Sequence, residues 1–280
     1  MTSTISSQSI LFRHEWQGRT LMVVDEKGYR SLYFDNQMIQ SRMALEHPLW
    51  LVLPYTQHML AALLFNAHPR HILMIGLGGG SLAKFFLHYF PNCRLEVVDA
   101  NPEMAAIARQ FFFLPHTERL TLHCADGGDF VQAIQAKSPS YDLIILDAFD
   151  HDGMAPSLYH DDFFRQLEPH LAEDGVLALN VNRAEGRAYR QVLATIGQRF
   201  PGTLLRLPVP PPSHNEILFC CREKALDTAG RLGPPQAAPW ADHQPPLDFV
   251  DFLERIVPLK QSFWQQWKHR FVRYTGRQQA

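Results

Sequence analysis

The stretch His71–Pro102, HILMIGLGGGSLAKFFLHYFPNCRLEVVDANP, decides the fold of this chain. An apolar run of strand length is followed by alternating glycines (Gly76, Gly78, Gly80), a helical pattern, and a second apolar run that ends at Asp99. Glycines let a backbone turn tightly and approach a ligand, and the N–H groups that start the next helix are free. A carboxylate about 20 residues further on suits a ribose diol. A glycine triplet alone could serve only a turn, but with strand, helix and acid in register it predicts a nucleoside-cofactor site.

The same alternation continues to about residue 222 and predicts the core of the fold. Helical patterns alternate with apolar runs, and a strand pair split by prolines comes last. The helical patterns lie at 101–112, 158–171 and 188–200, with one more between Gly127 and Ile134. The strands lie at 120–127, 143–146, 174–182 and 204–221. Strands that alternate with helices form a mostly parallel sheet covered on both faces. The fold class is therefore α/β and Rossmann-like.

A small antiparallel β-domain is expected before this core. Residues 21–35 hold two runs rich in Val, Leu, Tyr and Phe around the turn at Asp25–Gly28, and a further strand is indicated near Ile39. Two or three strands are not stable alone, so this sheet must pack on the main domain or on a second subunit. Residues 43–55, interrupted by prolines, are expected to form a loop over the site, and residues 56–66 a helix.

The predicted organisation has three parts. Residues 1–55 form the N-terminal β-domain with its lid-like loop, residues 56–222 the nucleoside-cofactor domain, and residues 223–280 a linker with an aromatic helical tail. The linker is rich in Pro, Gly and Ala, and the tail has helical apolar spacing broken at Pro258. We expect the aromatic side chains of the tail to pack on the body or on a partner chain.

Composition narrows the possible partners. With 26 basic and 28 acidic residues the net charge is −2, which argues against nucleic-acid binding. No apolar segment has the length of a membrane span, and the first residues lack the basic start of a signal peptide. The four cysteines and fourteen histidines show no metal-binding spacing. These features predict a cytoplasmic protein that holds no metal and acts on a small-molecule substrate. A homodimer is expected because the β-domain and the aromatic tail can pack on a second copy, and twofold dimers are the commonest assembly.

Three acids follow three predicted strands: Asp99, Asp126 and Asp147. Because ligands of such sheets bind beyond the carboxyl ends of the strands, these acids should belong to one site. Structural alternatives exist, since Asp99 could cap a helix and Asp126 could be a turn residue. A further acid, Asp142, precedes its strand and could simply be solvated. Together the three strand-end acids suggest that Asp99 holds the ribose and Asp126 accepts from the adenine amine.

The reacting end of the cofactor would face Asp147, with Asp150 one turn further on. Carboxylates there suit attraction of an amine and acceptance of its proton as it attacks, and they do not suit acyl transfer. The glycine turn is not followed by the lysine that a triphosphate site would need.

Five segments resemble, in order and spacing, the spermidine synthase (polyamine aminopropyltransferase) family. They are GLGGGS, VVDANPEM, ADGGDF, LDAFDHDGMAPSLYHDDFFRQLEPHLAEDGVL and PSHNEILFCC. The resemblance covers residues 20 to 222 and implies a small β-domain ahead of a Rossmann-like fold of the class I methyltransferase type. It also implies transfer of an aminopropyl group from decarboxylated S-adenosylmethionine to a diamine such as putrescine.

The resemblance assigns roles by position. Asp99 matches the ribose-binding acid of the family, the pair Asp126–Gly127 matches its adenine-binding pair, and Gln57 matches a glutamine that contacts the cofactor. Asp147 matches the proton-accepting aspartate, and Asp150 matches its diamine-binding companion.

Departures from the family concern mainly the amine side. Gly79 stands where the family carries an aspartate that pairs with the amine of the cofactor and repels the carboxylate of intact S-adenosylmethionine. Thr56 replaces a tyrosine, although Tyr55 is adjacent, and the late-loop tyrosine falls within Pro210–Pro212. The N-terminal Tyr-Gln pair has no clear counterpart, and Asp-Pro-x-Gly-Pro has become residues 150–156, DHDGMAP.

Three hypotheses follow. The chain is an aminopropyltransferase with an unusual amine acceptor, as Asp147 and Asp150 suggest. Alternatively it is an S-adenosylmethionine-dependent methyltransferase on the same scaffold, as Gly79 suggests, or a non-catalytic homologue that keeps the nucleoside pocket. A shared scaffold does not by itself decide among them.

Overall fold

A computed structural model describes most of the chain. The described residues are 9–16, 18–35, 38–134, 140–150, 153–201, 203–222, 225, 240, 243 and 246–258. The linker prediction for 223–247 and the tail beyond Pro258 fall largely or wholly outside these residues.

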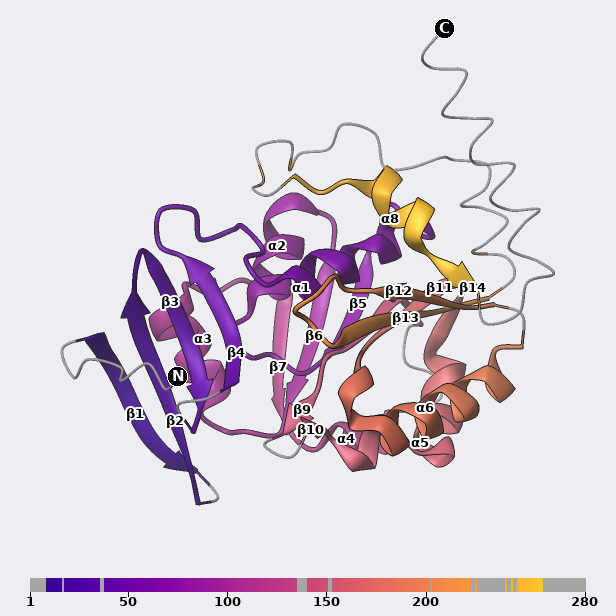
Figure 1. The fold of residues 1–280 in the computed structure, drawn as a ribbon, viewed down its shortest axis with the longest axis horizontal. Helices are drawn as coiled ribbons and strands as arrows, with labels where there is room; N and C mark the ends of the chain where they lie inside the picture. Colours follow the sequence, from indigo (N-terminus) through magenta and orange to yellow (C-terminus); the bar gives the residue numbers. More distant parts are fainter. Residues whose placement is uncertain are drawn as a thin grey trace, which may run out of the picture.

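An eight-stranded sheet forms the centre of the molecule, in the order β14-β12-β13-β11-β8-β5-β6-β7 (Figure 1). Its strands are β5 (His71–Ile75), β6 (Arg94–Asp99), β7 (Leu120–Cys124), β8 (Tyr141–Leu146), β11 (Leu171–Asn182), β12 (Leu204–Pro208), β13 (Asn215–Cys221) and β14 (Val257–Pro258). Strands β7, β6, β5, β8 and β11 are parallel, and β13, β12 and β14 continue the sheet antiparallel. The order reverses between β5 and β8, where such sheets bind ligands.

Helices cover both faces of this sheet, as predicted. One apolar core packs under α1 (Pro54–Met59), η2 (Leu60–Leu64), α2 (Ser81–Tyr89), α3 (Met104–Phe112) and α8 (Phe249–Arg255). The other packs under α4 (Gly127–Ala133), η3 (Pro156–Leu158), α5 (Asp161–Leu167) and α6 (Gly186–Arg199). Strand β5 shows why both faces are covered, because Ile72 and Met74 enter the first core and Leu73 and Ile75 the second. The short elements are η4 (Glu168–His170), η5 (Arg183–Glu185), β9 (Phe149–Asp150) and β10 (Gly153–Met154).

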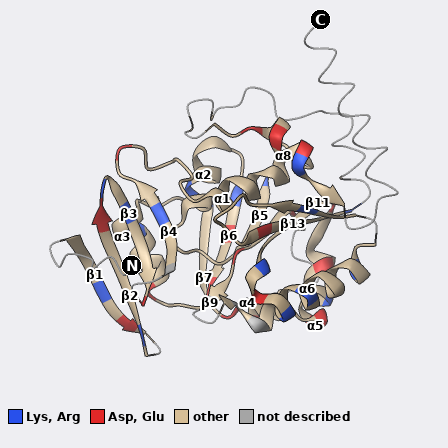
Figure 2. Cartoon of the chain, in the orientation of Figure 1, with Lys and Arg blue, Asp and Glu red and all other residues tan. Residues whose placement is uncertain are grey.

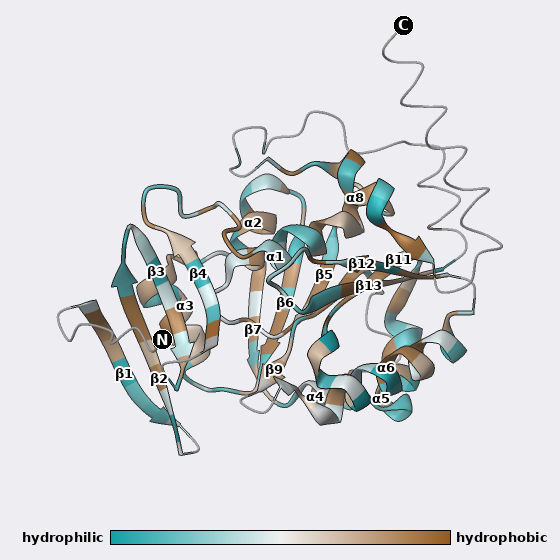
Figure 3. Cartoon of the chain, in the orientation of Figure 1, coloured by the Kyte–Doolittle hydropathy of each residue, from teal (hydrophilic) through white to brown (hydrophobic). Residues whose placement is uncertain are grey.

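The N-terminal sheet has four antiparallel strands: β1 (Ile10–Trp16), β2 (Arg19–Glu26), β3 (Tyr29–Phe34) and β4 (Met38–Ala44). Its apolar inner face joins the main core through Leu21, Val23, Leu32 and Met43, and Figure 3 shows the apolar bands along these strands. The sequence analysis did not delimit β1, in which exposed residues (Leu11, Arg13 and Glu15) alternate with half-buried ones at the edge of the sheet.

Two local expectations were wrong. Asp142 is not simply solvated, because its Oδ2 accepts hydrogen bonds from the backbone N–H groups of Arg70 (2.7 Å) and His71 (2.9 Å) and so fixes the start of β5. The helix predicted from residue 101 begins at Met104, because the Asn101 side chain accepts from the Glu103 N–H (2.9 Å) and forms a turn first.

The C-terminal helix packs on the body, as expected. Phe249 and Phe252 of α8, together with Trp240, join the first core. His243 accepts the Leu51 N–H (2.6 Å), and Arg255 Nη2 donates to the Pro208 carbonyl (2.6 Å). These contacts hold the segment before α1 against the main domain.

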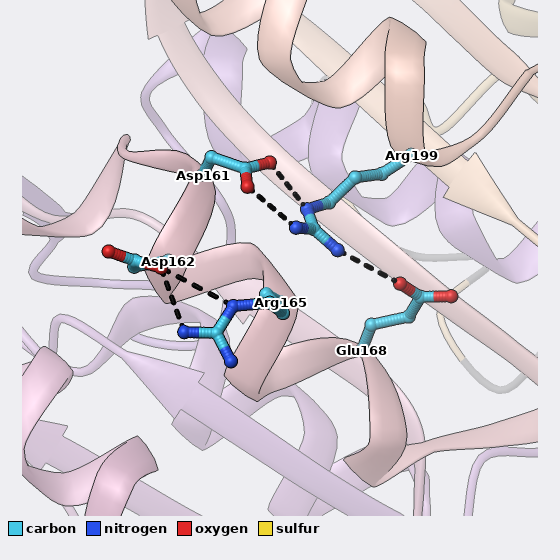
Figure 4. Close-up of polar contacts among 5 residues, drawn as sticks. All are labelled: Asp161, Asp162, Arg165, Glu168 and Arg199. Atoms are coloured by element: carbon cyan, nitrogen blue, oxygen red, sulfur yellow. Dashed lines mark hydrogen bonds and ion pairs between the residues drawn. The ribbon is translucent and has the colours of Figure 1, made fainter.

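Charged groups of both signs are dispersed over the described elements (Figure 2). One cluster joins α5 to α6 (Figure 4): Arg199 donates twice to Asp161, both at 2.8 Å, and lies 3.6 Å from Glu168. Arg165 also donates to Asp162 within α5 (2.8 Å). In the part of the chain that is described, no helix is long and apolar enough to cross a membrane.

Candidate active site

A cavity of about 480 Å³ lies beyond the carboxyl ends of the central strands. The N-terminal sheet contributes Leu32, Phe34, Ser41 and Arg42 to its lining, and Tyr55 from α1 lies on the same cavity. The glycine turn, the ends of β6, β8 and β11, the start of α4 and the start of β13 also line it. A volume of this size suits a nucleoside with a short side chain.

The glycine turn passes very close to the end of β8. Gly76 has φ +99°, and a Cβ built on it would lie 2.2 Å from the Asp147 carbonyl oxygen. The turn is held by bonds from Gly76 N–H to the Val98 carbonyl (2.8 Å) and from Asp147 N–H to the Ile75 carbonyl (2.9 Å). Gly76 and Gly78 line the cavity. Gly80 is not among its lining residues and starts α2 in the left-handed conformation, so its cofactor role stays a prediction.

Asp99 holds the glycine turn rather than the helix that follows it. Its Oδ2 accepts from Leu77 N–H (2.9 Å) and its Oδ1 from Asn101 N–H (2.9 Å), and it also bonds the N–H of Gly78. Burial raises the pKa of Asp99, and these backbone hydrogen bonds oppose the rise. The Asp99 carboxylate therefore lies on the cavity next to the glycine turn, and its role toward a ribose stays a prediction.

Asp126 and Gly127 also line the cavity. Asp126 is the N-cap of α4, because its Oδ1 accepts from Gly128 N–H (2.8 Å) and Asp129 N–H (3.2 Å). Gly127 permits close packing, since a Cβ there would lie 2.6 Å from the Ile75 side chain. The structural alternative for Asp126 is thus real, and the exposed carboxylate can still accept from an adenine amine.

Asp147 is the third acid on the cavity, so the structure brings the three strand-end acids to one site. Its Oδ1 accepts from Asn180 Nδ2 (2.9 Å), and the hydroxyl of Tyr55 hydrogen-bonds to the same carboxylate. Burial raises the pKa of Asp147, and both donors oppose that rise. Burial and the charge of Asp147 together raise the pKa of Tyr55 well above its usual range, so its hydroxyl keeps its proton.

The structure places two other predicted residues differently. The backbone of Asp150 pairs with Gly153 in the β9–β10 ribbon, and its side chain lies outside the described residues. Gln57 is buried and donates from Nε2 to the Leu51 carbonyl (2.6 Å), and it is not among the residues that line the cavity. The roles given to Asp150 and Gln57 therefore remain predictions.

Gly79 lies beneath the N-terminal sheet. Its N–H donates to Ser41 Oγ (2.7 Å), and a Cβ built on it would lie 2.9 Å from both Ser41 Cβ and Phe112 Cδ1. An aspartate at this position would require β4 or α3 to shift. The glycine is thus matched to its surroundings, and the turn carries no carboxylate of its own.

Two buried amides that line the cavity were missed by the sequence analysis. Asn180 stands in the apolar run of β11 with only 2% of its surface exposed, and a buried amide within such a strand was the available signal. Asn101 is 5% exposed and lines the cavity, and among the described residues its Nδ2 has no hydrogen-bond partner. A buried amide without a partner is unfavourable, so this donor suits a bound ligand.

Two further features of the described residues concern possible metal ligands and the cysteine thiols. Within the described residues, no group of three or more His, Cys, Asp or Glu side chains could hold a metal ion. Cys93, Cys220 and Cys221 are buried, and burial raises the pKa of Cys93 to about 12, so its thiol stays protonated.

A glycine turn and three strand-end acids around a cavity at the reversal of strand order give the arrangement of an α/β protein of the class I methyltransferase type. Comparison with known proteins gives the family. The spermine/spermidine synthase domain matches residues 54–222, and this chain belongs to that family.

Individual relatives support the assignment. The chain is 32% identical to the polyamine aminopropyltransferase of Chromobacterium violaceum over 252 residues, which cover 86% of this chain and 90% of that protein. A probable spermidine synthase from Corynebacterium glutamicum shares the fold at TM-score 0.66 and 17% identity, covering 92% of this chain and 93% of that one. The mouse eEF1A lysine and N-terminal methyltransferase is 35% identical over 70% of this chain but only 27% of its own length.

Proposed function

We propose that this chain is an aminopropyltransferase of the spermidine synthase type, a transferase of polyamine biosynthesis. The observation that carries the proposal is the Asp147 carboxylate, which lies on the nucleoside-sized cavity between two hydrogen-bond donors. The extended similarity to a polyamine aminopropyltransferase supports the same reaction.

The cofactor half of the cavity would hold the nucleoside of decarboxylated S-adenosylmethionine. Asp99 would accept from the ribose hydroxyls, Asp126 from the exocyclic adenine amine, and the backbone of Gly76 and Gly78 would lie against the cofactor. When bound, the sulfonium makes the adjacent propyl carbon electrophilic. The cavity then needs only to align an amine with that carbon.

Asp147 would accept the proton of the attacking amine. The amine nitrogen forms a bond to the propyl carbon while the carbon–sulfur bond breaks, and methylthioadenosine leaves with the electron pair on sulfur. The proton of the amine passes to Asp147, directly or after attack. Donation from Asn180 and Tyr55 opposes the rise in the pKa of Asp147 that burial causes, and so favours the ionised form of this carboxylate before the reaction.

Methyl transfer from intact S-adenosylmethionine is the second candidate. Gly79 favours it, because the turn lacks the carboxylate that would repel the carboxylate of the intact cofactor. The similarity to the mouse methyltransferase points the same way. The same cavity would bind either form, so the two candidates differ in the cofactor that the chain selects.

Calorimetric titration with decarboxylated S-adenosylmethionine, S-adenosylmethionine and methylthioadenosine tests the proposal. Aminopropyl transfer predicts that the decarboxylated form binds more tightly than the intact form. Equal or tighter binding of the intact form would favour methyl transfer. Absence of binding by all three would remove both candidates.

Replacement of Asn101 by Asp should weaken nucleoside binding. Asp retains the oxygen that accepts from Glu103 N–H but loses the partnerless Nδ2 donor. We expect the Kd of methylthioadenosine, an uncharged ligand, to rise by about 3- to 10-fold, the worth of one hydrogen bond. Calorimetry measures the change.

The matched control is Asn66→Asp. Asn66 makes the same kind of turn, accepting from His68 N–H (3.2 Å), and it does not line the cavity. Its replacement should leave the Kd unchanged. Equal Kd values for wild type and Asn101→Asp would show that Asn101 does not contact the nucleoside.

A homodimer in the cytoplasm belongs to the same proposal. The N-terminal sheet, with the exposed side chains of Leu11 and Tyr29, offers a surface for a second copy, and twofold dimers are the commonest assembly. Light scattering on the purified protein measures the mass in solution and tests the dimer.

A further inference from the structure

A chain of side-chain hydrogen bonds leads from the proline-rich loop to Asp147. Ser213 Oγ donates to Asn215 Oδ1 (2.7 Å), Asn215 Nδ2 donates to Asn180 Oδ1 (2.9 Å), and Asn180 Nδ2 donates to Asp147 Oδ1 (2.9 Å). All four residues line the cavity. They come from four places along the chain, namely the loop before β13, the start of β13, the C-terminal end of β11 and the residue after β8.

This relay, Ser213–Asn215–Asn180–Asp147, has one consistent direction. A carboxamide carries its donor and its acceptor on opposite branches, so the bond that Asn180 Oδ1 accepts from Asn215 turns Asn180 Nδ2 toward Asp147. With the amide reversed, an oxygen would face the carboxylate and repel it. The Ser213 hydroxyl, which can donate or accept, donates to Asn215 Oδ1 and completes the relay.

The surrounding backbone holds the relay in place. The Tyr159 hydroxyl donates to the Asn180 carbonyl (3.2 Å), and Asn215 N–H donates to Ser213 Oγ (3.1 Å). Arg183 N–H donates to the His214 carbonyl (2.9 Å), which fixes the loop to the end of β11. Because Asn180 is buried within a central strand, its amide has little freedom other than the reversal that Asn215 prevents.

We propose that Asn180 and Asn215 are positioning residues that aim the Asp147 carboxylate at the cavity and hold it ionised for proton acceptance. The proposal rests on the proposed function for its consequence in catalysis, but not for its electrostatic content.

The relay predicts the direction in which the pKa of Asp147 changes when a donor is lost. Donation from Asn180 opposes the burial that raises the pKa of Asp147. Loss of the donor should therefore raise this pKa further. As the pH falls, activity should then be lost at a higher pH than in the wild type. The other charged or titratable groups that face this carboxylate or share its cavity stay the same in every variant: Tyr55, Asp99, Asp126, Arg19 and Arg42.

Three variants test the relay. Asn180→Leu removes the donor at similar volume. Asn215→Asp is isosteric and still accepts from Ser213, but it no longer donates to Asn180 Oδ1 and instead favours the reversed amide. Asn182→Asp places the same charge on the residue opposite Asn215 in the β11–β13 pairing, outside the relay.

The titration of Asp147 is followed directly by carboxyl-carbon NMR, with the signal assigned by its absence in Asp147→Asn. We expect the apparent pKa to rise by about one to two units in Asn180→Leu, the worth of a hydrogen bond to a charged group. It should rise by about one unit in Asn215→Asp and by less in Asn182→Asp. Thermal melts confirm that each variant is folded.

The outcomes separate the relay from the proposed function. An unchanged Asp147 titration in both Asn180→Leu and Asn215→Asp would overturn the relay, as would an equal or larger rise in Asn182→Asp. If the wild type shows transfer activity, the acid limb of kcat/KM should move with the NMR titration. If the wild type shows none while the NMR shifts appear, the proposed function fails and the relay stands.

Discussion

Replacing Asp147 by Asn lowers kcat by about 100-fold or more, while binding of methylthioadenosine changes little. Asn has nearly the same shape and keeps an oxygen that can accept from Asn180, so the cavity retains its form. It cannot take the proton of the attacking amine at neutral pH. Steady-state turnover and calorimetry on the same preparation measure the two effects.

Asp142→Asn is the matched control. It makes the same change at the other end of β8, away from the cavity, where an amide oxygen can still accept from Arg70 and His71. We expect kcat within about 2-fold of wild type, as is usual for changes remote from the chemistry. If Asp147→Asn kept more than a third of wild-type kcat, Asp147 would not be the base. If Asp147→Asn also left the biological role unchanged, the non-catalytic hypothesis would gain support.

Replacing Gly76 by Ala damages both stability and catalysis. The added Cβ would lie 2.2 Å from the Asp147 carbonyl oxygen and 2.8 Å from its carbonyl carbon, and φ is +99°. The left-handed backbone costs about 1–2 kcal/mol, and the overpacking costs about 1–3 kcal/mol more. The end of β8 must move to relieve the contact, so the Asp147 side chain moves with it. Urea unfolding and turnover measure the two losses.

Gly28→Ala separates these effects. Gly28 also has positive φ (+80°), but a Cβ on it meets nothing within 4 Å. It should lose about 1 kcal/mol of unfolding free energy through backbone strain alone and keep wild-type kcat. Equal unfolding free energies for the two variants would show that the Asp147 backbone moves away from the added Cβ at no cost in stability.

The fold and the location of the site were predictable because both depend on local patterns. The period of the apolar residues distinguishes strands from helices, and the sense of the strands follows from their alternation with helices. Asp99, Asp126 and Asp147 could be placed together because the carboxyl ends of parallel strands share one edge. The N-terminal sheet was recognised in outline from the same signals.

What the sequence did not reveal depends on contacts between distant residues. Asp142 was misjudged because its partners, Arg70 and His71, lie about 70 positions earlier in the chain. The relay joins Asp147 to Asn180 and Asn180 to Asn215, in separate strands that only the finished sheet brings together. The periodicity of apolar residues carries no information about such pairings. The hydrogen-bond partners of Asp147, the proposed base, could therefore be identified only from the structure.

The most direct test of the account is product analysis with decarboxylated S-adenosylmethionine as the donor and a panel of amines that includes putrescine. Mass spectrometry should detect methylthioadenosine together with an equal amount of an aminopropylated amine, and both should fall by about 100-fold in Asp147→Asn. Parallel reactions with intact S-adenosylmethionine should give no methylated product. A methylated product with the intact cofactor and no aminopropyl transfer with any amine would contradict the account.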